Sequence, residues 1–520
     1  MYKLLLCWRY LRTRYIALIC IVSVTLGVAT MIVVNSVMAG FTAKMKSEMN
    51  SMLGDLTVQV NSLDGVPDAP GHMARIKQAL RDQVVGMSPM IAVYAQLYMQ
   101  VGGGSSTRGV MLIGIDEATY ATVSGLGKLL QHPSNRERLS FQLHDGGYDT
   151  ADHDVQDPAA VADRPELGFA GWPYRKALAE HRQAQREAYQ RAHAADAAAP
   201  GAATEIADPF AQRQASAGQE AGPAGRDFDP AVEQHTGIVL ALSECSSRYP
   251  DGSTHLYNRP GDDLRVVMPT ASLPPDVLSD NYTIVDVYTD PMRVDNASMA
   301  FVPLAHLQKI RGMIDPTIGA ERGGRFTSIQ IKLQPGADAT AARDKLRTLF
   351  DGMHYSVTTW QDNQAMLLHA IQTETTVLNI LLFFIVAVAG FGILAIFYMI
   401  VVEKTRDIGI LKSLGASSLG IMGIFLTYGL SLGLVGAGAG TVLGLTFSAH
   451  INEVADLLER VQGAPVFDPS VYFFDRIPTV IDPWTIAWIT AGSVAIAVVA
   501  SVMPALRAAK LHPVRALRFE

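Results

Sequence analysis

The sequence predicts an integral membrane protein with four transmembrane helices and a large extracytoplasmic α+β domain. Three observations predict this class: four long runs without charged residues, an uneven distribution of lysine and arginine around them, and a polar stretch rich in turn residues after the first run. One run precedes that stretch and three follow it, which gives a 1+3 arrangement. The chain has 520 residues, enough for more than one folding unit.

Each apolar run is long enough to cross the ~30 Å hydrocarbon core of a bilayer as a helix. The runs comprise residues 16–38, 377–402, 419–449 and 484–506. A cleaved signal peptide is the alternative interpretation of the first run, because basic residues precede it. Its apolar core exceeds the ~7–15 residues of a signal peptide, and no small-x-small cleavage site follows it. We therefore expect an uncleaved membrane anchor.

Lysine and arginine predict the orientation of the chain in the membrane. They concentrate in residues 1–15, 403–418 and 507–520, whereas residues 450–483 carry six acidic side chains against two arginines. Loops rich in lysine and arginine stay on the cytoplasmic side. Both termini and the segment 403–418 are therefore expected in the cytoplasm, and residues 45–370 and 450–483 outside it.

The third apolar run contains glycines at small-xxx-small spacing. They are Gly429, Gly433, Gly436, Gly440 and Gly444. In lipid, such a face lets two helix backbones approach closely, where apolar burial alone does not drive association. Glycine is also common in membrane helices in general, but the regular spacing favours tight packing against another helix.

Two separated segments of the large domain show patterns of strands and amphipathic helices, which predicts a porter-like α/β part. The middle part, residues 239–306, alternates short apolar runs with Pro, Gly and Asp and predicts a mainly β subdomain. The expected strands are 56–60, 93–100, 110–115, 327–333 and 355–359, and the expected helices are 73–85 and 341–350.

Residues 131–234 are poor in aliphatic side chains and rich in Ala, Gln, Asp, Pro and Gly. Little apolar surface is available there to offset the entropy of ordering the chain, so we predict a mostly disordered insertion. A solvated helix is expected at 176–195, where Glu187 and Arg191 have the spacing of an ion pair. The histidines of the segment have no ligand spacing and are interpreted as solvent-exposed: His132, His144, His153, His181, His193 and His235.

No motif for catalysis by this chain is present. A nucleotide site needs a G-x-x-x-x-G-K-[ST] loop, and the nearest imitation, residues 102–107, lacks the lysine and is better explained as a hairpin turn. Neither G-x-S-x-G nor H-E-x-x-H occurs. Of three cysteines (Cys7, Cys20, Cys245) only Cys245 lies in the large domain, so neither a disulfide framework nor a Cys-x-x-Cys metal site is expected. We expect no catalytic residue, no metal ligand and no cofactor in this chain.

The segment 403–417 combines charges with an apolar stripe at Ile408, Leu411 and Leu414, the spacing of a short amphipathic helix. Gly415 is placed to end that helix. From the residues alone, two interpretations remain open. The helix is either an interfacial anchor, or a lever that a soluble partner contacts.

This segment resembles the corresponding loop of FtsX-type permeases of ABC transporters, and most of all that of the lipoprotein-releasing LolC/LolE group. Other parts of the chain resemble the same group: Trp360, Asn363, Leu367 and Glu374, and residues 108–116, 294–296 with 301–304, 471–478 and 504–518. The long insertion at 131–234 departs from the family pattern and leaves the carrier-binding surface unassigned.

The resemblance implies a permease subunit in the cell inner membrane that pairs with a second permease copy or paralogue and with two copies of a separate ATPase. ATP and Mg²⁺ would bind to that ATPase, and the implied substrate is a lipoprotein passed to a periplasmic carrier. Leu411 is expected to be a central ATPase contact and Lys412 a peripheral one. The implied coupling residues are Glu403, Lys404, Arg406, Asp407, Ile408, Leu411, Lys412, Leu414 and Gly415. Two alternatives are a MacB-like exporter and an FtsX-like mechanotransducer that activates a periplasmic enzyme.

Overall fold

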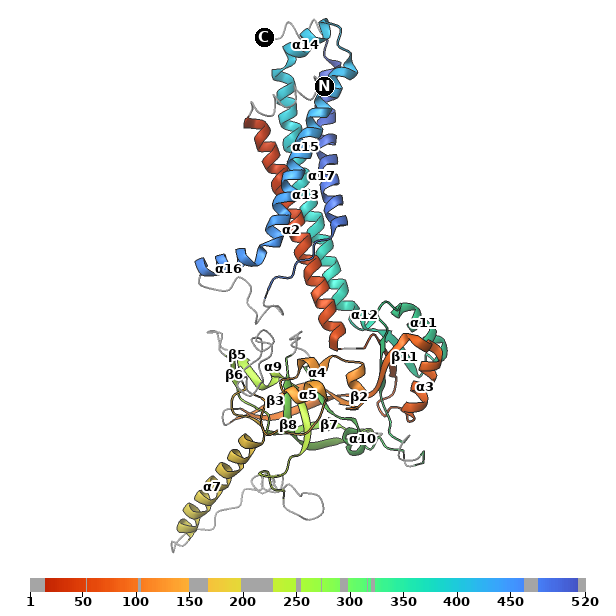
Figure 1. Cartoon of the computed structure of the whole chain (residues 1–520), viewed down its shortest axis with the longest axis vertical. Helices are drawn as coiled ribbons and strands as arrows, with labels where there is room; N and C mark the ends of the chain where they lie inside the picture. The colour runs from red at the N-terminus through yellow and green to blue at the C-terminus, as the bar shows by residue number, and fades with distance from the viewer. Residues whose placement is uncertain are drawn as a thin grey trace. The chain divides into compact units, whose positions relative to one another are not determined.

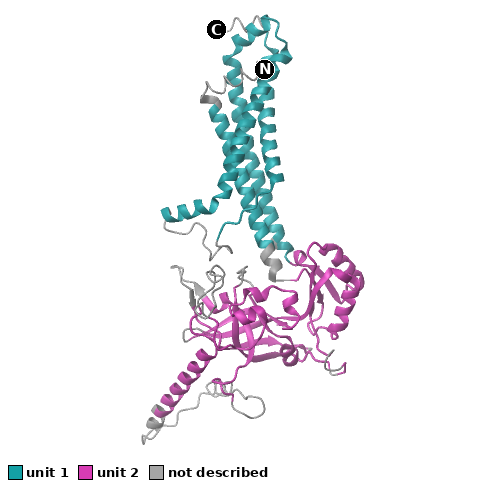
Figure 2. Ribbon diagram, viewed as in Figure 1, with its two compact units in different colours: residues 1–47, 364–520 teal, residues 48–363 magenta. Residues whose placement is uncertain are grey.

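The computed structural model consists of two compact units, residues 1–47 with 364–520 and residues 48–363 (Figure 2). It describes residues 15–52, 54–101, 104–148, 167–197, 228–248, 254–272, 274–289, 298–315, 317–318, 323–462 and 476–512. Parts of the sequence used above, namely 1–14, 294–296, 471–475 and 513–520, lie outside the described residues.

The first unit is a helical bundle (Figure 1). Its helices are α2 (Tyr15–Met52), α13 (Ala365–Glu403), α14 (Thr405–Ser413), α15 (Ser418–Ala449), α16 (Ile451–Gln462) and α17 (Pro483–Lys510). Four of them, α2, α13, α15 and α17, are long and apolar enough to cross a membrane, as predicted. The first two extend beyond the predicted apolar runs, because the helical hydrogen bonding continues into their polar flanks.

The bundle has a core of its own that joins all four long helices. Val28 of α2, Phe397 of α13, Leu432 of α15 and Ala505 of α17 are among its buried members. The last helix begins at a strong cap, since the Asp482 carboxylate accepts hydrogen bonds from the first backbone N–H groups.

The second unit contains a nine-stranded sheet with strand order β11-β1-β10-β2-β3-β9-β4-β8-β7. The strands are β1 (Leu56–Val60), β2 (Val84–Val101), β3 (Gly104–Ile115), β4 (Thr236–Ala241), β7 (Asp263–Pro269), β8 (Val277–Tyr288), β9 (Ser298–Pro303), β10 (Ser328–Leu333) and β11 (Tyr355–Thr359). A separate two-stranded sheet pairs β5 (Ser246–Arg248) with β6 (Thr254–Leu256).

Strand β2 belongs to two parts of this sheet. Its first half pairs with β10, whereas Gln96, Leu97 and Tyr98 pair with β7. The second pairing closes β2, β3, β9, β4, β8 and β7 into a ring. The strands of this ring and the helices packed against them form one hydrophobic core. A second core lies among β1, β10, β11, α3 and α11.

The helices of the second unit are short apart from one. They are α3 (Ala69–Leu80), η1 (Arg81–Gln83), η2 (Tyr120–Thr122), α4 (Leu126–Leu129), α5 (Pro133–Glu137), α7 (Gly171–Ala197), α9 (Leu242–Cys245), α10 (Leu304–Ile310), α11 (Ala339–Leu349) and α12 (Trp360–Asn363). The helix predicted at 73–85 begins earlier, because Asp68 caps it, and ends at Leu80, because the chain then enters β2. The hairpin prediction is confirmed, since β2 and β3 pair up to Val101 and Gly104.

The prediction of a mostly disordered insertion at 131–234 is wrong for its described ends. Leu139, Phe141, Leu143 and Tyr148 are buried in the main core of the sheet unit. The low aliphatic content concealed these few large side chains, which suffice because the ring provides the rest of the core. The solvated helix is present within α7, and Glu187 pairs with Arg191 at 3.4 Å. Residues 149–166 and 198–227 lie outside the described residues.

The histidine interpretation is also wrong at three positions. His132 is buried, and its ring stacks on that of His144 with 3.9 Å between centroids. His235 is half-buried, and its ring stacks on that of Phe228 with 4.0 Å between centroids. His181 is exposed, as expected, and His153 lies outside the described residues. Spacing along the chain did not indicate the stacked pair of histidines, because the residues meet through the fold of 131–148 rather than along one helix or strand.

Candidate functional site

Along the chain, the short helix α14 connects the long helices α13 and α15. Gly415 ends it in a left-handed conformation (φ +95°), which glycine adopts without strain. The Ala416 N–H then donates to the Leu411 carbonyl at 3.0 Å, and Ser417 caps α15 by accepting from the Gly420 N–H at 3.1 Å. The residues expected to form an amphipathic helix ended by Gly415 therefore do form one.

The two faces of α14 differ in accessibility. Ile408 is 3% exposed and belongs to the core of the bundle, and Thr405 and Gly409 of the same helix are also buried. Ile410, Leu411 and Leu414 are exposed, and Leu414 is 80% exposed. We call these three residues the α14 patch. Ile408 was expected to contact a partner, but in this chain its side chain is covered by the bundle.

The charged residues of the segment divide in the same way. Lys404 forms an ion pair with Asp407 at 2.8 Å on the outer side of the turn. The Lys412 ammonium instead points inward and donates to the backbone carbonyls of Ala509 (2.6 Å) and Leu511 (2.8 Å), at the end of α17. Arg406 and Glu403 are exposed. The α14 patch is thus held on the bundle from beneath by Ile408 and Lys412.

The glycine face of α15 meets two helices. A Cβ at Gly433 would lie 2.9 Å from the Ala497 Cβ of α17, and a Cβ at Gly440 would lie 2.7 Å from the Thr25 carbonyl oxygen of α2. Gly429 also lies against α17, and Gly436 and Gly444 lie against α2. The Thr25 hydroxyl donates to the Gly436 carbonyl at 3.1 Å. These approaches are closer than a larger residue permits, so α15 packs tightly against both α2 and α17.

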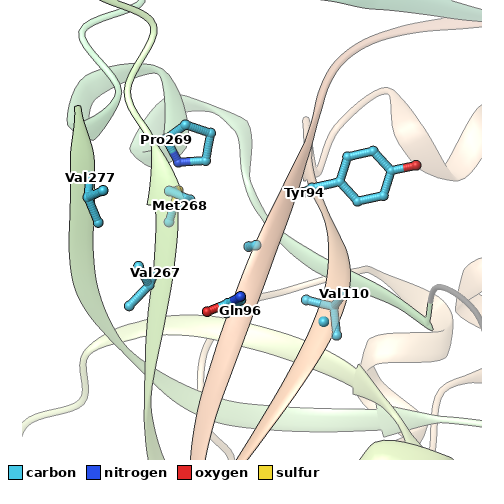
Figure 3. Close-up of a pocket in the computed structure, with 9 residues that line it drawn as sticks. Tyr94, Gln96, Val110, Val267, Met268, Pro269 and Val277 are labelled. Carbon is cyan, nitrogen blue, oxygen red and sulfur yellow. The ribbon is translucent and has the colours of Figure 1, made fainter. Parts of the chain in front are cut away.

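The sheet unit has an open apolar groove of about 430 Å³ beside the seam where β2 pairs with β7 (Figure 3). In Figure 3, Val267, Met268, Pro269 and Val277 lie on one side, and Gln96 and Val110 on the other. The sequence did not indicate this groove, because it depends on the pairing of strands that are far apart in the chain.

A buried carboxylate holds residues 131–148 on the sheet. Asp286 of β8 is fully buried and accepts from the Asn135 amide at 2.7 Å, from the Val287 N–H at 2.8 Å and from the His132 N–H at 3.2 Å. Burial raises the pKa of Asp286 to about 7, although these donors counteract the shift. Burial also lowers the pKa of His144, which stacks on His132.

This cluster has the character of a structural element rather than a reaction centre. Its polar groups are satisfied by one another, and within the described residues no three His, Cys, Asp or Glu side chains are arranged to hold a metal ion. Cys20 and Cys245 are buried free thiols. The α14 patch and the apolar groove, in contrast, are accessible to a partner.

Two family models match this chain. The FtsX-like permease C-terminal model matches residues 379–513, and the MacB-like periplasmic core domain model matches residues 17–149. The first match begins within α13 and includes α14 with the α14 patch, α15, α16 and α17. The second begins in α2 and continues through β1, β2 and β3.

Individual relatives point to the same group. The lipoprotein-releasing system transmembrane protein LolC of Neisseria meningitidis is 29% identical over 302 residues, which is 57% of this chain and 68% of the relative. LolC of Xylella fastidiosa is 30% identical over 222 residues, 43% of this chain and 51% of the relative. The macrolide export ATP-binding/permease protein MacB of Bdellovibrio bacteriovorus is 28% identical over 203 residues, 37% of this chain and 28% of the relative.

The matches span about half to two thirds of the length of these LolC proteins, and a smaller part of MacB. They agree with the four apolar helices and with the strand-rich unit between the first and second of them. The chain therefore contains an FtsX-like permease C-terminal domain and a MacB-like periplasmic core domain, and it is similar over much of its length to LolC-type permeases.

Proposed function

We propose that this permease couples ATP hydrolysis by a separate ABC ATPase to the release of lipoproteins from the outer leaflet of the cytoplasmic membrane to a periplasmic carrier. The observation that carries the coupling role is the α14 patch. Its three apolar side chains are exposed, while Ile408 and Lys412 fix the same helix to the bundle. A surface of this kind transmits a push from a soluble partner to α13, α15 and α17.

The lipoprotein substrate is supported by similarity to LolC and LolE, which are named as lipoprotein-releasing proteins. Removing an acyl chain from lipid costs ~0.8 kcal/mol per CH₂. Three chains of membrane-lipid length therefore cost on the order of tens of kcal/mol. A carrier that re-buries the chains offsets most of this cost, and ATP hydrolysis supplies the remainder.

The complex contains two ATPase copies, which bind ATP and Mg²⁺, and a second permease copy or paralogue. Both termini and α14 lie in the cytoplasm, and the sheet unit lies outside it. The support for this orientation is the distribution of lysine and arginine. A periplasm-active reporter fused after Asp468 is active in this orientation, and one fused after Ser417 is silent. The reversed pattern would remove α14 from reach of a cytoplasmic ATPase.

Export of another molecule is the second candidate function. It is favoured by the MacB-like core model and by the similarity to MacB of Bdellovibrio bacteriovorus, which is named a macrolide exporter. Proteoliposomes that contain the permease and its ATPase distinguish the two. ATP-dependent transfer of a triacylated lipoprotein to a soluble carrier supports release, whereas ATP-dependent macrolide transport without lipoprotein transfer supports export.

The coupling role is tested with Leu411→Asp and Leu414→Asp. Truncating a central apolar contact of a protein interface costs ~2 kcal/mol or more, about 30-fold in affinity, so both variants lose co-purification with the ATPase. Ser413→Asp is the matched control, because it places the same charge on an exposed position of the same helix without removing an apolar side chain. Normally inserted Leu411→Asp and Leu414→Asp proteins that still bind and stimulate the ATPase would rule out the α14 patch as the lever.

A further inference from the structure

Helix α16 is strongly amphipathic, and the second half of its apolar face is exposed. At ~100° per residue, its apolar positions occupy an arc of roughly 160°. Leu457, Leu458 and Val461 on this face are exposed, and Val461 is 77% exposed. The opposite face carries Glu453, Asp456, Glu459 and Arg460.

The position of α16 follows from the helix before it. The membrane-span candidate α15 ends at Ala449, and α16 begins at Ile451. His450 makes the turn, since its N–H donates to carbonyls of the last turn of α15 and its own carbonyl accepts from the Val454 N–H. Figure 1 shows α16 projecting sideways from the end of the bundle. In a membrane, this direction lies along the surface rather than across it.

The first turn of α16 is hydrogen-bonded to the segment that leads into α17. The Asn452 side chain accepts from the Ile477 N–H at 2.8 Å and donates to the Ile477 carbonyl at 3.4 Å. The Val480 N–H donates to the Ser36 carbonyl of α2 at 3.0 Å. All three bonds belong to the bundle unit, so the sideways position of α16 does not depend on the sheet unit.

The start of α17 carries side chains that are typical of a membrane interface. Trp484 and Trp488 are exposed and pack edge to face, with 5.9 Å between ring centroids. Tryptophan side chains gather where hydrocarbon meets headgroups, because the ring is apolar and its N–H is polar. Residues 476–482 are hydrogen-bonded to the first turn of α16 and lead directly into α17. The two tryptophans at the start of α17 therefore lie at the same end of the bundle as α16.

We propose that α16 binds the lipid surface, with Leu457, Leu458 and Val461 among the acyl chains and the acidic face toward water. Three acidic side chains against one arginine make this helix unsuited to anionic headgroups, so the lipid it fits is zwitterionic. In the proposed orientation this surface is the outer leaflet. The lipid contact requires only the four spans and is independent of the ATPase and of the substrate.

The test compares two labels on opposite faces of α16. Val461→Cys and Glu459→Cys are made in a Cys7→Ser background, since Cys20 and Cys245 are buried. Each is labelled with the fluorophore NBD, and equal labelling in detergent shows that both sites are accessible. The proteins are then placed in phosphatidylcholine nanodiscs with and without a doxyl-labelled phosphatidylcholine that quenches near the headgroups.

We expect a blue-shifted emission and several-fold stronger quenching for the label at 461 than for the label at 459. Equal, water-like emission at both sites would overturn the lipid contact. A blue shift at 461 without quenching by the doxyl lipid would also overturn it, because the apolar face would then be covered by protein. Replacing part of the phosphatidylcholine with phosphatidylglycerol is expected to reduce quenching at 461, and an increase would overturn the headgroup preference.

Discussion

The Lys412 ammonium donates a hydrogen bond of 2.6 Å to the backbone carbonyl of Ala509. This bond joins α14 to the last turn of α17, whose final carbonyls have no partner within their own helix. The positive charge also lies at the negative end of the α17 dipole. Lys412 was expected to be a peripheral contact of a partner, but its geometry makes it an internal link between the coupling helix and a membrane span.

Lys412→Met is therefore expected to loosen α14 while leaving its apolar patch unchanged. Hydrogen bonds to a charged group contribute ~1.5–3 kcal/mol, so amide exchange in α14 should rise by about tenfold or more. Lys404→Met is the matched control, because the ion pair of Lys404 with Asp407 is partly exposed and worth less than ~1 kcal/mol. Equal exchange in the two variants would contradict the link, and hydrogen exchange with mass spectrometry measures it.

The glycine face of α15 allows a tightly packed glycine to be compared with one that has no close neighbour. Gly440→Ala places a methyl group 2.7 Å from the Thr25 carbonyl oxygen, and backbone atoms of α2 cannot move aside cheaply. Gly438→Ala, two residues away, meets no atom within 4 Å. Overpacking a tight contact costs ~1–3 kcal/mol, so Gly440→Ala should lower the thermal stability of the purified protein and Gly438→Ala should not. Similar melting temperatures would show that α2 and α15 are not closely packed.

The four long helices were predictable from the sequence because length and the absence of charge suffice to identify a span. The α14 helix was also predictable, since Ile408, Leu411, Leu414 and Gly415 carry its period and its end. What the pattern did not reveal is which side chains face inward. Ile408 is buried in the bundle core, to which helices far apart in the chain contribute. Lys412 likewise bonds to Ala509, 97 residues further along the chain.

The fold of residues 131–148 was missed for a related reason. Average composition over a long segment conceals a few large apolar residues, and a disordered segment and a docked one can share the same composition. The polar link between His132 and Asp286 spans 154 positions of the chain. No local periodicity reports such a contact, so only the fold shows that this stretch belongs to the core.

A matched pair of phenylalanines tests this correction. Phe141 is 2% exposed in the core of the sheet unit, whereas Phe169 is 54% exposed. Phe141→Ala is expected to cost ~3–5 kcal/mol, and Phe169→Ala less than ~1 kcal/mol. Pulse proteolysis of the whole protein in denaturant measures both. An equally small cost for both variants would restore the interpretation of this segment as a dispensable insertion.

The buried Asp286 predicts a dependence of stability on pH. Burial raises the pKa of its carboxyl to about 7, whereas an unfolded aspartate titrates near ~3.9. Between these values the folded chain binds a proton that the unfolded chain has released. The stabilising contribution of this group is therefore complete below about pH 4 and is lost as the pH rises to about 7. His144 acts in the opposite direction, because burial lowers its pKa.

The contributions of Asp286 and His144 are separated by comparing the stability of the natural sequence with that of Asp286→Asn at each pH, since this substitution removes only the Asp286 carboxyl. The stability of the natural sequence relative to the variant is expected to be greater at pH 5 than at pH 8, by about 3 kcal/mol, because pH 5 lies about two units below the folded pKa and one pKa unit corresponds to ~1.4 kcal/mol. Hydrogen exchange of the β8 amides around Val287 at the two pH values measures this difference. A difference that does not change with pH would mean that Asp286 stays charged in the fold. The bonds from Asn135, Val287 and His132 would then outweigh the cost of burying the carboxylate.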